Sequence, residues 1–134
     1  MHANLIPGAI SGGDLSTRQF QAVRISTTSD SPFRIDEVTV NSQRPIGILQ
    51  NKPANSTGAP LEVAILGSVV KAKYGGAVNN GDALGVDAAG LLVSLGQGDP
   101  STGSDRYIIA QALEDGSSSE VHYVIVVSPH LLAS

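Results

Sequence analysis

The chain has 134 residues, which is the length of one domain with a moderate hydrophobic core. It contains no cysteine, so a disulfide framework and a thiolate metal site are both excluded. Charged residues make up only 15% of the chain, whereas an ordinary soluble domain carries about 25%. We therefore expect part of its surface to be covered by a partner protein or by copies of itself.

The net charge of -4 and the pI near 5.1 argue against direct nucleic-acid binding, because affinity for a phosphate backbone comes from Lys and Arg side chains that release counterions. The longest apolar runs, such as 124–127, are far shorter than the roughly 20 residues of a membrane span. The N-terminal residues 1–8 lack a basic region and a continuous apolar region. We therefore predict no membrane span and no signal peptide, and a protein made in the cytoplasm of the producing cell.

Residues 1–13 mix Gly, Pro, Ser and Asn with the isolated apolar residues Leu5, Ile6 and Ile10. So few apolar residues cannot form a core of their own. We predict an extended arm that docks on another surface, with a frayed terminus as the alternative. Residues 20–25 then alternate apolar with polar or small side chains, as a half-buried strand does.

The stretch 45–95 is the framework of the predicted domain. Its apolar pieces consist mostly of Val, Ile, Leu and Ala, and every break carries Gly, Pro, Asn or Asp. This pattern predicts short strands joined by tight turns, with turns at 79–82 and 87–90. Gly67 lies inside the apolar run 61–73, so we predict a bulge or bend there.

The last third of the chain predicts a loop at 96–105 that projects from the domain, a strand at 106–114 and a turn at 115–119. The strongest strand of the chain follows at 120–127, and we interpret 128–134 as a second docking tail.

The strand at 120–127 is apolar on both faces. Val121, Tyr123, Ile125 and Val127 share one face, and Val124 and Val126 make the other face apolar near its end. A strand that is apolar on both faces is buried on both. In so small a domain, we expect a neighbouring subunit to bury the second apolar face of this strand.

These elements predict an all-β fold, a compact single β domain formed by a barrel- or sandwich-like meander of short strands. Its predicted parts are an extended N-terminal arm at 1–13, the β domain at 14–127 and a C-terminal tail at 128–134.

The sequence favours no catalytic or metal site. His2, His122 and His130 lie in different parts of the chain, with no two at metal-ligand spacing, and we interpret His122 as a polar residue on a strand face or at a subunit contact. The Gly-Gln-Gly at 96–98 lacks the third Gly of a dinucleotide loop. Most acidic residues occupy turns, where they bond their own backbone, so a calcium site is the less favoured alternative. We therefore predict a protein that is not an enzyme and binds no cofactor or metal.

The order of several short motifs resembles the capsid cement or head-decoration proteins of tailed phages and prophages. The matching residues extend from position 14 to position 127 and are DLSTRQF at 14–20 with Val23, IGILQNKP at 46–53, EVA at 62–64, GSVVK at 67–71, GGAVNNGD at 75–82, DAAG at 87–90 and AQALE at 110–114. Each piece is a turn or strand pattern, and only the ordered set is specific. The arm before Asp14 and the loop at 96–105 are longer than in the shorter members of the family.

The resemblance implies a homo-oligomer, usually a trimer, on the outer surface of an icosahedral head, where it bridges adjacent major capsid subunits and stabilises the shell against internal DNA pressure. We expect Leu5, Ile6 and Ile10 to contact the capsid. We expect Tyr123, Val124 and Val126 to form contacts between copies.

Two alternatives remain open. One is a surface-displayed binding module, similar to a head fibre, whose loop at 96–104 contacts a host or environmental ligand. The other is a carrier domain related to lipoyl domains, which Lys71 and Lys73 do not favour because neither lies in the required hairpin. We interpret Lys71, Lys73 and Arg106 as solvated strand charges, with pairing to acidic groups of a shell protein as the alternative.

Overall fold

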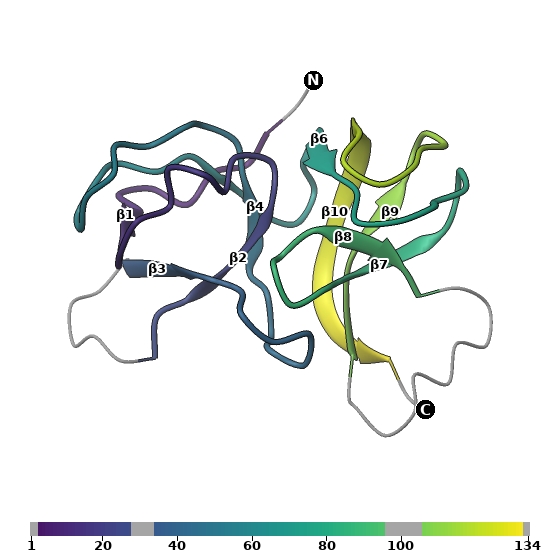
Figure 1. Cartoon of the computed structure of the whole chain (residues 1–134), viewed down its shortest axis with the longest axis horizontal. Coiled ribbons are helices and arrows are strands. Elements are labelled where there is room, and N and C mark those ends of the chain that lie inside the picture. The colour runs from purple at the N-terminus through teal and green to yellow at the C-terminus, as the bar shows by residue number, and fades with distance from the viewer. Residues whose placement is uncertain (1–2, 28–33, 96–105, 133–134) are drawn as a thin grey trace.

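The computed structural model describes residues 3–27, 34–95 and 106–132. Over these ranges the chain forms ten strands and no helix, which confirms the predicted all-β class. The strands belong to two five-stranded sheets that lie side by side (Figure 1). The predicted loop at 96–105 lies outside the described residues, as does His2.

The first sheet has the order β1-β3-β2-β4-β5. Its strands are β1 (Ile10–Ser11), β3 (Arg34–Glu37), β2 (Ala22–Ile25), β4 (Gly47–Leu49) and β5 (Val63–Ala64). The pair β1–β3 is parallel, and the other neighbours are antiparallel. Of these strands, β4 and β5 lie in the stretch 45–95, where the sequence predicts short apolar strands joined by tight turns.

The N-terminal segment joins the two edges of this sheet. On one side β1 pairs with β3. On the other side Leu5 forms a bridge with Ala64, and Ile10 forms one with Pro60. The amide of Ser11 also donates to the carbonyl oxygen of Ala59 at 2.9 Å. The extended segment that the sequence predicts at 1–13 therefore lies along its own chain from Leu5 to Ser11.

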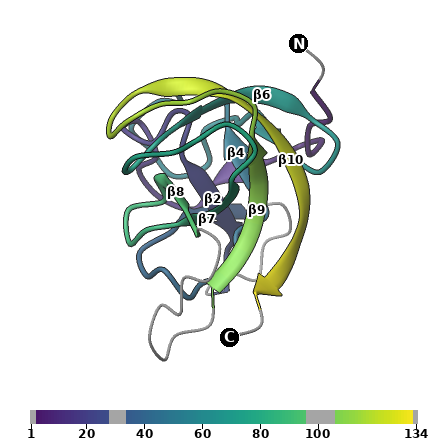
Figure 2. The same ribbon diagram turned by 90° about the vertical axis from the view of Figure 1, so that its right-hand side faces the viewer.

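The second sheet has the order β6-β10-β9-β7-β8. Its strands are β6 (Val69–Lys73), β10 (Val121–Leu132), β9 (Arg106–Ala112), β7 (Ala83–Val86) and β8 (Leu92–Ser94). Figure 2 shows the strong curvature of β9 and β10. Because of this curl, Tyr74 at the end of β6 forms a bridge with Leu92 of β8, so the two edge strands meet at one end of a half-barrel.

Strand β10 extends beyond the predicted boundary at residue 127. His130, Leu131 and Leu132 pair with β9, so the predicted tail at 128–134 is part of a strand as far as Leu132. The register shifts between Val126 and His130, and Pro129 lies inside this shift. A proline has no N–H to donate, so a break in the ladder is where a strand tolerates it.

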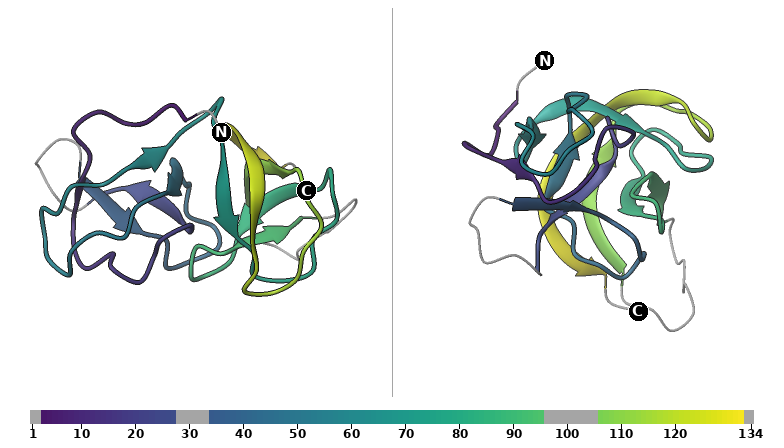
Figure 3. Two further views of the ribbon diagram at one scale, coloured as in Figure 1. Left: turned by 90° about the horizontal axis from the view of Figure 1, so that it is seen from above. Right: turned by 60° about the vertical axis from the view of Figure 1, so that its left-hand side comes forward.

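Strands β4 and β5 and the start of β2 are buried on both faces. On one face, Val23 and Leu49 pack into the core of the first half of the molecule. On the other face, their neighbours Ala22 and Ile48 pack into the core that is shared with the second sheet. This arrangement explains why consecutive apolar residues occur in β2, β4 and β5, whereas β3 is mostly charged. The two halves of the molecule meet along this shared core, as the left view of Figure 3 shows.

Glycines with positive φ form the predicted bends. Gly67, with φ of 88°, separates β5 of the first sheet from β6 of the second. Gly81 and Gly90, with φ of 91° and 83°, lie in the predicted turns at 79–82 and 87–90. These conformations are accessible to glycine without steric cost. No helix in the described part of the chain is long and apolar enough to cross a membrane.

Candidate interaction surface

The convex side of the second sheet carries a row of exposed and half-buried apolar side chains. Along β10 the side chains alternate, so that Val124 is 0% exposed whereas its neighbour Tyr123 is 37% exposed. Across the ladder Val69 faces Ile125, and the amide of Leu113 donates to the carbonyl oxygen of Tyr123 at 3.2 Å. We call this surface the outer apolar face, and it consists of Val69, Leu113, Val121, Tyr123, Ile125 and Val127.

The structure corrects two of the three predicted contacts between copies. Val124 and Val126 are only 0% and 1% exposed, because both side chains point into the core between the sheets. They are therefore not accessible to a second copy. Tyr123 remains exposed, and Val121 and Leu113 lie beside it as exposed apolar residues that the sequence analysis did not select.

Tyr123 contacts strand β6 through its ring and the turn after β9 through its amide. The ammonium nitrogen of Lys71 lies 5.8 Å from the centre of the Tyr123 ring, within the range of a cation–π interaction. The amide of Tyr123 donates to Oε1 of Glu114 at 2.6 Å. Lys71 therefore covers part of the ring, which is otherwise open to solvent at the surface.

A cluster of charged and aromatic side chains supports the hairpin between β9 and β10. Nε2 of His122 lies 3.1 Å from Oε1 of Glu120, and Nδ1 lies 3.6 Å from Oε1 of Glu114. The His122 ring packs on Tyr74 with 5.2 Å between the ring centres. The hydrogen bond with His122 lowers the pKa of Glu120, and the amide of Ser117 adds to this effect. This cluster fixes the hairpin beside the outer apolar face.

Burial raises the pKa of Tyr74 to about 12, with a further contribution from the carboxylate of Glu114. Its hydroxyl donates to the carbonyl oxygen of Glu114 at 2.9 Å. Tyr74 therefore stays neutral and acts as a structural residue. Among the described residues, no group of three or more His, Asp and Glu side chains is arranged to hold a metal ion.

The three predicted capsid contacts occupy different environments. Leu5 is exposed, Ile6 packs partly against the core of the first sheet, and Ile10 is half-buried in β1. Leu66, which is 54% exposed, lies close to this segment, because Nδ2 of Asn4 donates to the carbonyl oxygen of Leu66 at 3.2 Å. Leu5 and Leu66 therefore form a second, smaller apolar area at the turn between β5 and β6.

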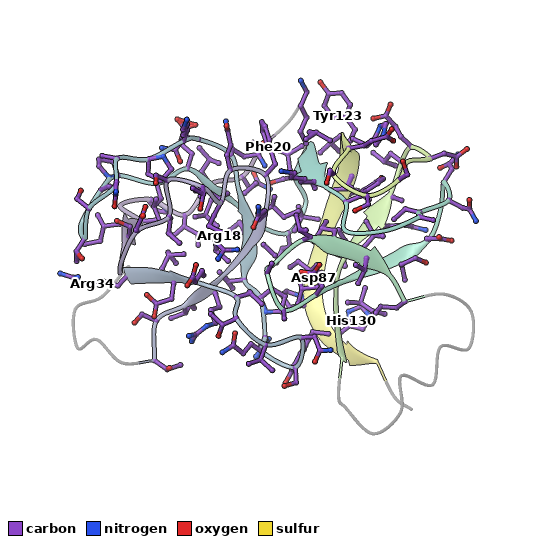
Figure 4. The ribbon with its side chains drawn as sticks, in the orientation of Figure 1. Arg18, Phe20, Arg34, Asp87, Tyr123 and His130 are labelled. Carbon is purple, nitrogen blue, oxygen red and sulfur yellow. The ribbon has the colours of Figure 1, made fainter. Side chains whose placement is uncertain are left out.

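Side-chain sticks in Figure 4 place Phe20 and Tyr123 at the same end of the molecule, where the two sheets meet. The main chain joins the segment before β2 to the second sheet here, since the amide of Lys73 in β6 donates to the carbonyl oxygen of Phe20 at 2.8 Å. Phe20 has a φ of 67°, which is unusual for a residue other than glycine. A main-chain hydrogen bond therefore holds together, in this part of the molecule, segments that are distant in the sequence.

No known protein family matches this chain, and no curated protein is similar to it in sequence. Among solved structures, it is similar to the N base of the head fiber protein gp8.5 of bacteriophage phi29, with a TM-score of 0.62 and 16% sequence identity. The match covers 94% of this chain and 95% of that chain. The likeness therefore shows a shared fold over almost the whole of both chains.

Proposed function

We propose that this chain is a structural protein of a phage head, bound to the outer surface of the shell. The observation that carries the proposal is the fold that it shares, over nearly its whole length, with the N base of a phage head fiber. The ordered motifs between positions 14 and 127, which resemble head-decoration proteins, point to the same location in the virion.

The finer proposal is that the chain acts as a capsid cement protein. It would bridge adjacent major capsid subunits and stabilise the shell against the pressure of packaged DNA. Its low charge and outer apolar face support this role, because both fit a protein that is partly covered in its working state. Three linked copies would raise the avidity for the shell by about 10² to 10⁴ without new kinds of contact.

A homotrimer is part of this proposal. Tyr123 and Leu113 are exposed apolar residues that fit contacts between copies, and Leu5 and Leu66 fit contacts with the capsid. A specific interface of about 800 Å² per partner would be sufficient for each contact.

The second candidate is a surface-displayed module that serves as the base of a head fibre and contacts a host or environmental ligand. The likeness to the N base of the phi29 head fiber favours it. Both candidates are attached to the head. As a cement protein the chain would stabilise the shell, whereas as a fibre base it would present a binding surface to a ligand.

The stability of heads to heat separates the two candidates. Heads that lack the chain are compared with complete heads, and the temperature at which packaged DNA is released is measured for both. The cement function predicts release at a lower temperature without the chain. Equal release temperatures, together with weaker adsorption to host cells, would instead favour the fibre base.

A further inference from the structure

A groove of about 490 Å³ lies where the two sheets meet, at the end of the molecule that carries Phe20 and Tyr123 (Figure 4). Three parts of the chain form it: the segment before β2, the residues after β4, and the neighbouring strands β6 and β10. Its lining residues are Ser16, Thr17, Gln19, Phe20, Lys52, Lys73, Ser119 and Val121.

All three lysines of this acidic protein lie in or beside the groove. Lys52 and Lys73 line it, and Lys71 is two residues from Lys73 on the same face of β6. None of the three forms an ion pair with any residue in the described ranges. Three positive charges thus gather on a chain whose net charge is -4, and none of them has an ion-pair partner among the described residues.

No carboxylate lines the groove, and the two nearest in sequence are engaged elsewhere. Glu120, next to Ser119 and Val121, accepts hydrogen bonds from the amide of Ser117 and from the His122 ring. Asp14 accepts from the amide and the hydroxyl of Ser16. Within residues 3–27, 34–95 and 106–132, the lysines of the groove therefore have no acidic partner.

The apolar side of the groove is preformed. Phe20 keeps a strained φ of 67° because its amide donates to Leu49 at 2.6 Å and its carbonyl oxygen accepts from Lys73 at 2.8 Å. Strain of this kind persists where the surrounding structure fixes the residue, and it is concentrated at functional sites. Val121 lies across the groove as a second apolar surface.

We propose that this groove receives an acidic, extended segment of the shell protein, an inference that rests on the proposed attachment to a phage head. Carboxylates of the segment pair with Lys52 and Lys73, and an apolar side chain between them packs against Phe20 and Val121. The chemistry favours a peptide over a nucleic acid. A phosphate backbone needs many cations to release its counterions, whereas the rest of this chain is acidic.

The groove is tested directly with the full chain and a fluorescent synthetic peptide of alternating Glu and Leu residues. We expect saturable binding that weakens as salt increases. The variants Lys52→Glu and Lys73→Glu are expected to weaken this binding by at least about tenfold each, because a favourable charge contact becomes repulsive. Circular dichroism establishes that each variant is folded.

Arg44→Glu is the matched control. It makes the same change of charge at an exposed residue, but Arg44 precedes β4 whereas Lys52 follows it, so the two lie at opposite ends of that strand. We expect Arg44→Glu to bind the peptide like the wild type. Equal loss in this variant would show a general charge effect and would overturn the proposal.

Three further results would also overturn it. They are no binding of the peptide, binding that is unchanged in both lysine variants, and tighter binding of a thymidine oligonucleotide of equal charge through the same lysines.

Sedimentation with assembled shells separates this inference from the proposed function. If the wild type and both lysine variants bind shells equally, the proposed function stands and the groove inference is wrong. If the wild type binds the peptide but not the shells, the proposed function fails, and the shell protein is excluded as the source of the segment. The inference requires that the wild type binds shells and that the lysine variants bind them less.

Discussion

The amide of Ala22 donates to the carbonyl oxygen of Gly90 at 2.8 Å, and this hydrogen bond joins β2 of the first sheet to the β7–β8 turn of the second. Gly90 has a φ of 83°, and a Cβ atom there would lie 2.7 Å from the carbonyl oxygen of Ala22. Only glycine fits this approach. This close approach, which requires a residue without a side chain, is therefore one of the contacts that fix the relative position of the two sheets.

The variant Gly90→Ala is expected to lower the free energy of unfolding by about 3 to 5 kcal/mol, because backbone strain and a collision with the main chain add together. Gly58→Ala is the matched control, since Gly58 has the same φ of 83° but no atom within 4 Å of an added Cβ. It should cost only about 1 to 2 kcal/mol from strain alone. Urea unfolding measures both, and equal costs would contradict the close packing of Gly90 on Ala22.

Adjacent residues of β10 are expected to have opposite roles. Val124→Ala leaves a cavity in the core and should reduce the free energy of unfolding by about 1 to 3 kcal/mol. Tyr123→Ser changes an exposed side chain and should cost less than about 1 kcal/mol, mostly through the lost contact with Lys71.

The two substitutions should affect self-association in the reverse order to their effects on stability. Analytical ultracentrifugation is expected to show weaker association for Tyr123→Ser and unchanged association for folded Val124→Ala. The reverse result would place the contact between copies elsewhere.

Stability at alkaline pH is expected to depend on Tyr74. Its pKa rises from an ordinary value of 10.0 to about 12 on folding. A raised pKa means that the folded state favours the neutral form of Tyr74. The stabilisation that follows from this preference is complete below pH 10 and is lost as the pH rises to about 12.

The variant Tyr74→Phe isolates this effect. It loses the hydrogen bond to Glu114 and about 1 kcal/mol at neutral pH. Its free energy of unfolding should fall less steeply than that of the wild type between pH 10 and 12, as thermal unfolding at several pH values can measure. Parallel curves for the two proteins would show that the ionisation of Tyr74 is not coupled to folding.

Stability at acid pH is expected to depend on Glu120. Its pKa is lowered from an ordinary value of 4.5 by the hydrogen bond with His122. Because the ionised form is favoured in the folded state, the stabilisation is present above that value and is lost as the pH falls below it. The loss of stability on acidification should therefore be smaller in Glu120→Gln than in the wild type.

Glu62→Gln is the comparison for this experiment, because Glu62 is exposed and has no ion pair among the residues that the structure describes. It should follow the wild-type acid profile. An acid profile for Glu120→Gln that also matches the wild type would refute the role of the His122 pair.

The sequence could predict local structure where a single residue determines the backbone conformation. Gly67, Gly81 and Gly90 marked bends because glycine adopts positive φ at little cost, and the structure confirms all three. It could also show that Tyr123 and Val124 lie on opposite faces of a strand. It could not show which face is inward, because both faces are apolar and the curl of the sheet decides between them.

Long-range pairings could not be predicted in this way. The bridges of Leu5 to Ala64 and of Ile10 to Pro60 join distant segments, and nothing in the spacing of these residues indicates their partners. The groove could not be predicted for the same reason, since Lys52 and Lys73 lie beside Phe20 only where the two sheets pack together. Such sites become visible when the fold brings their parts into contact.

Binding to shells tests the central proposal most directly. The purified chain is mixed with shells assembled from the major capsid protein of the same phage, and the copies bound per shell are measured after sedimentation. Saturable binding to the outer surface, lost in Leu5→Asp with Leu66→Asp but kept in Arg44→Glu, is the predicted result. A folded wild-type chain that stays in the supernatant at every concentration would contradict the proposal.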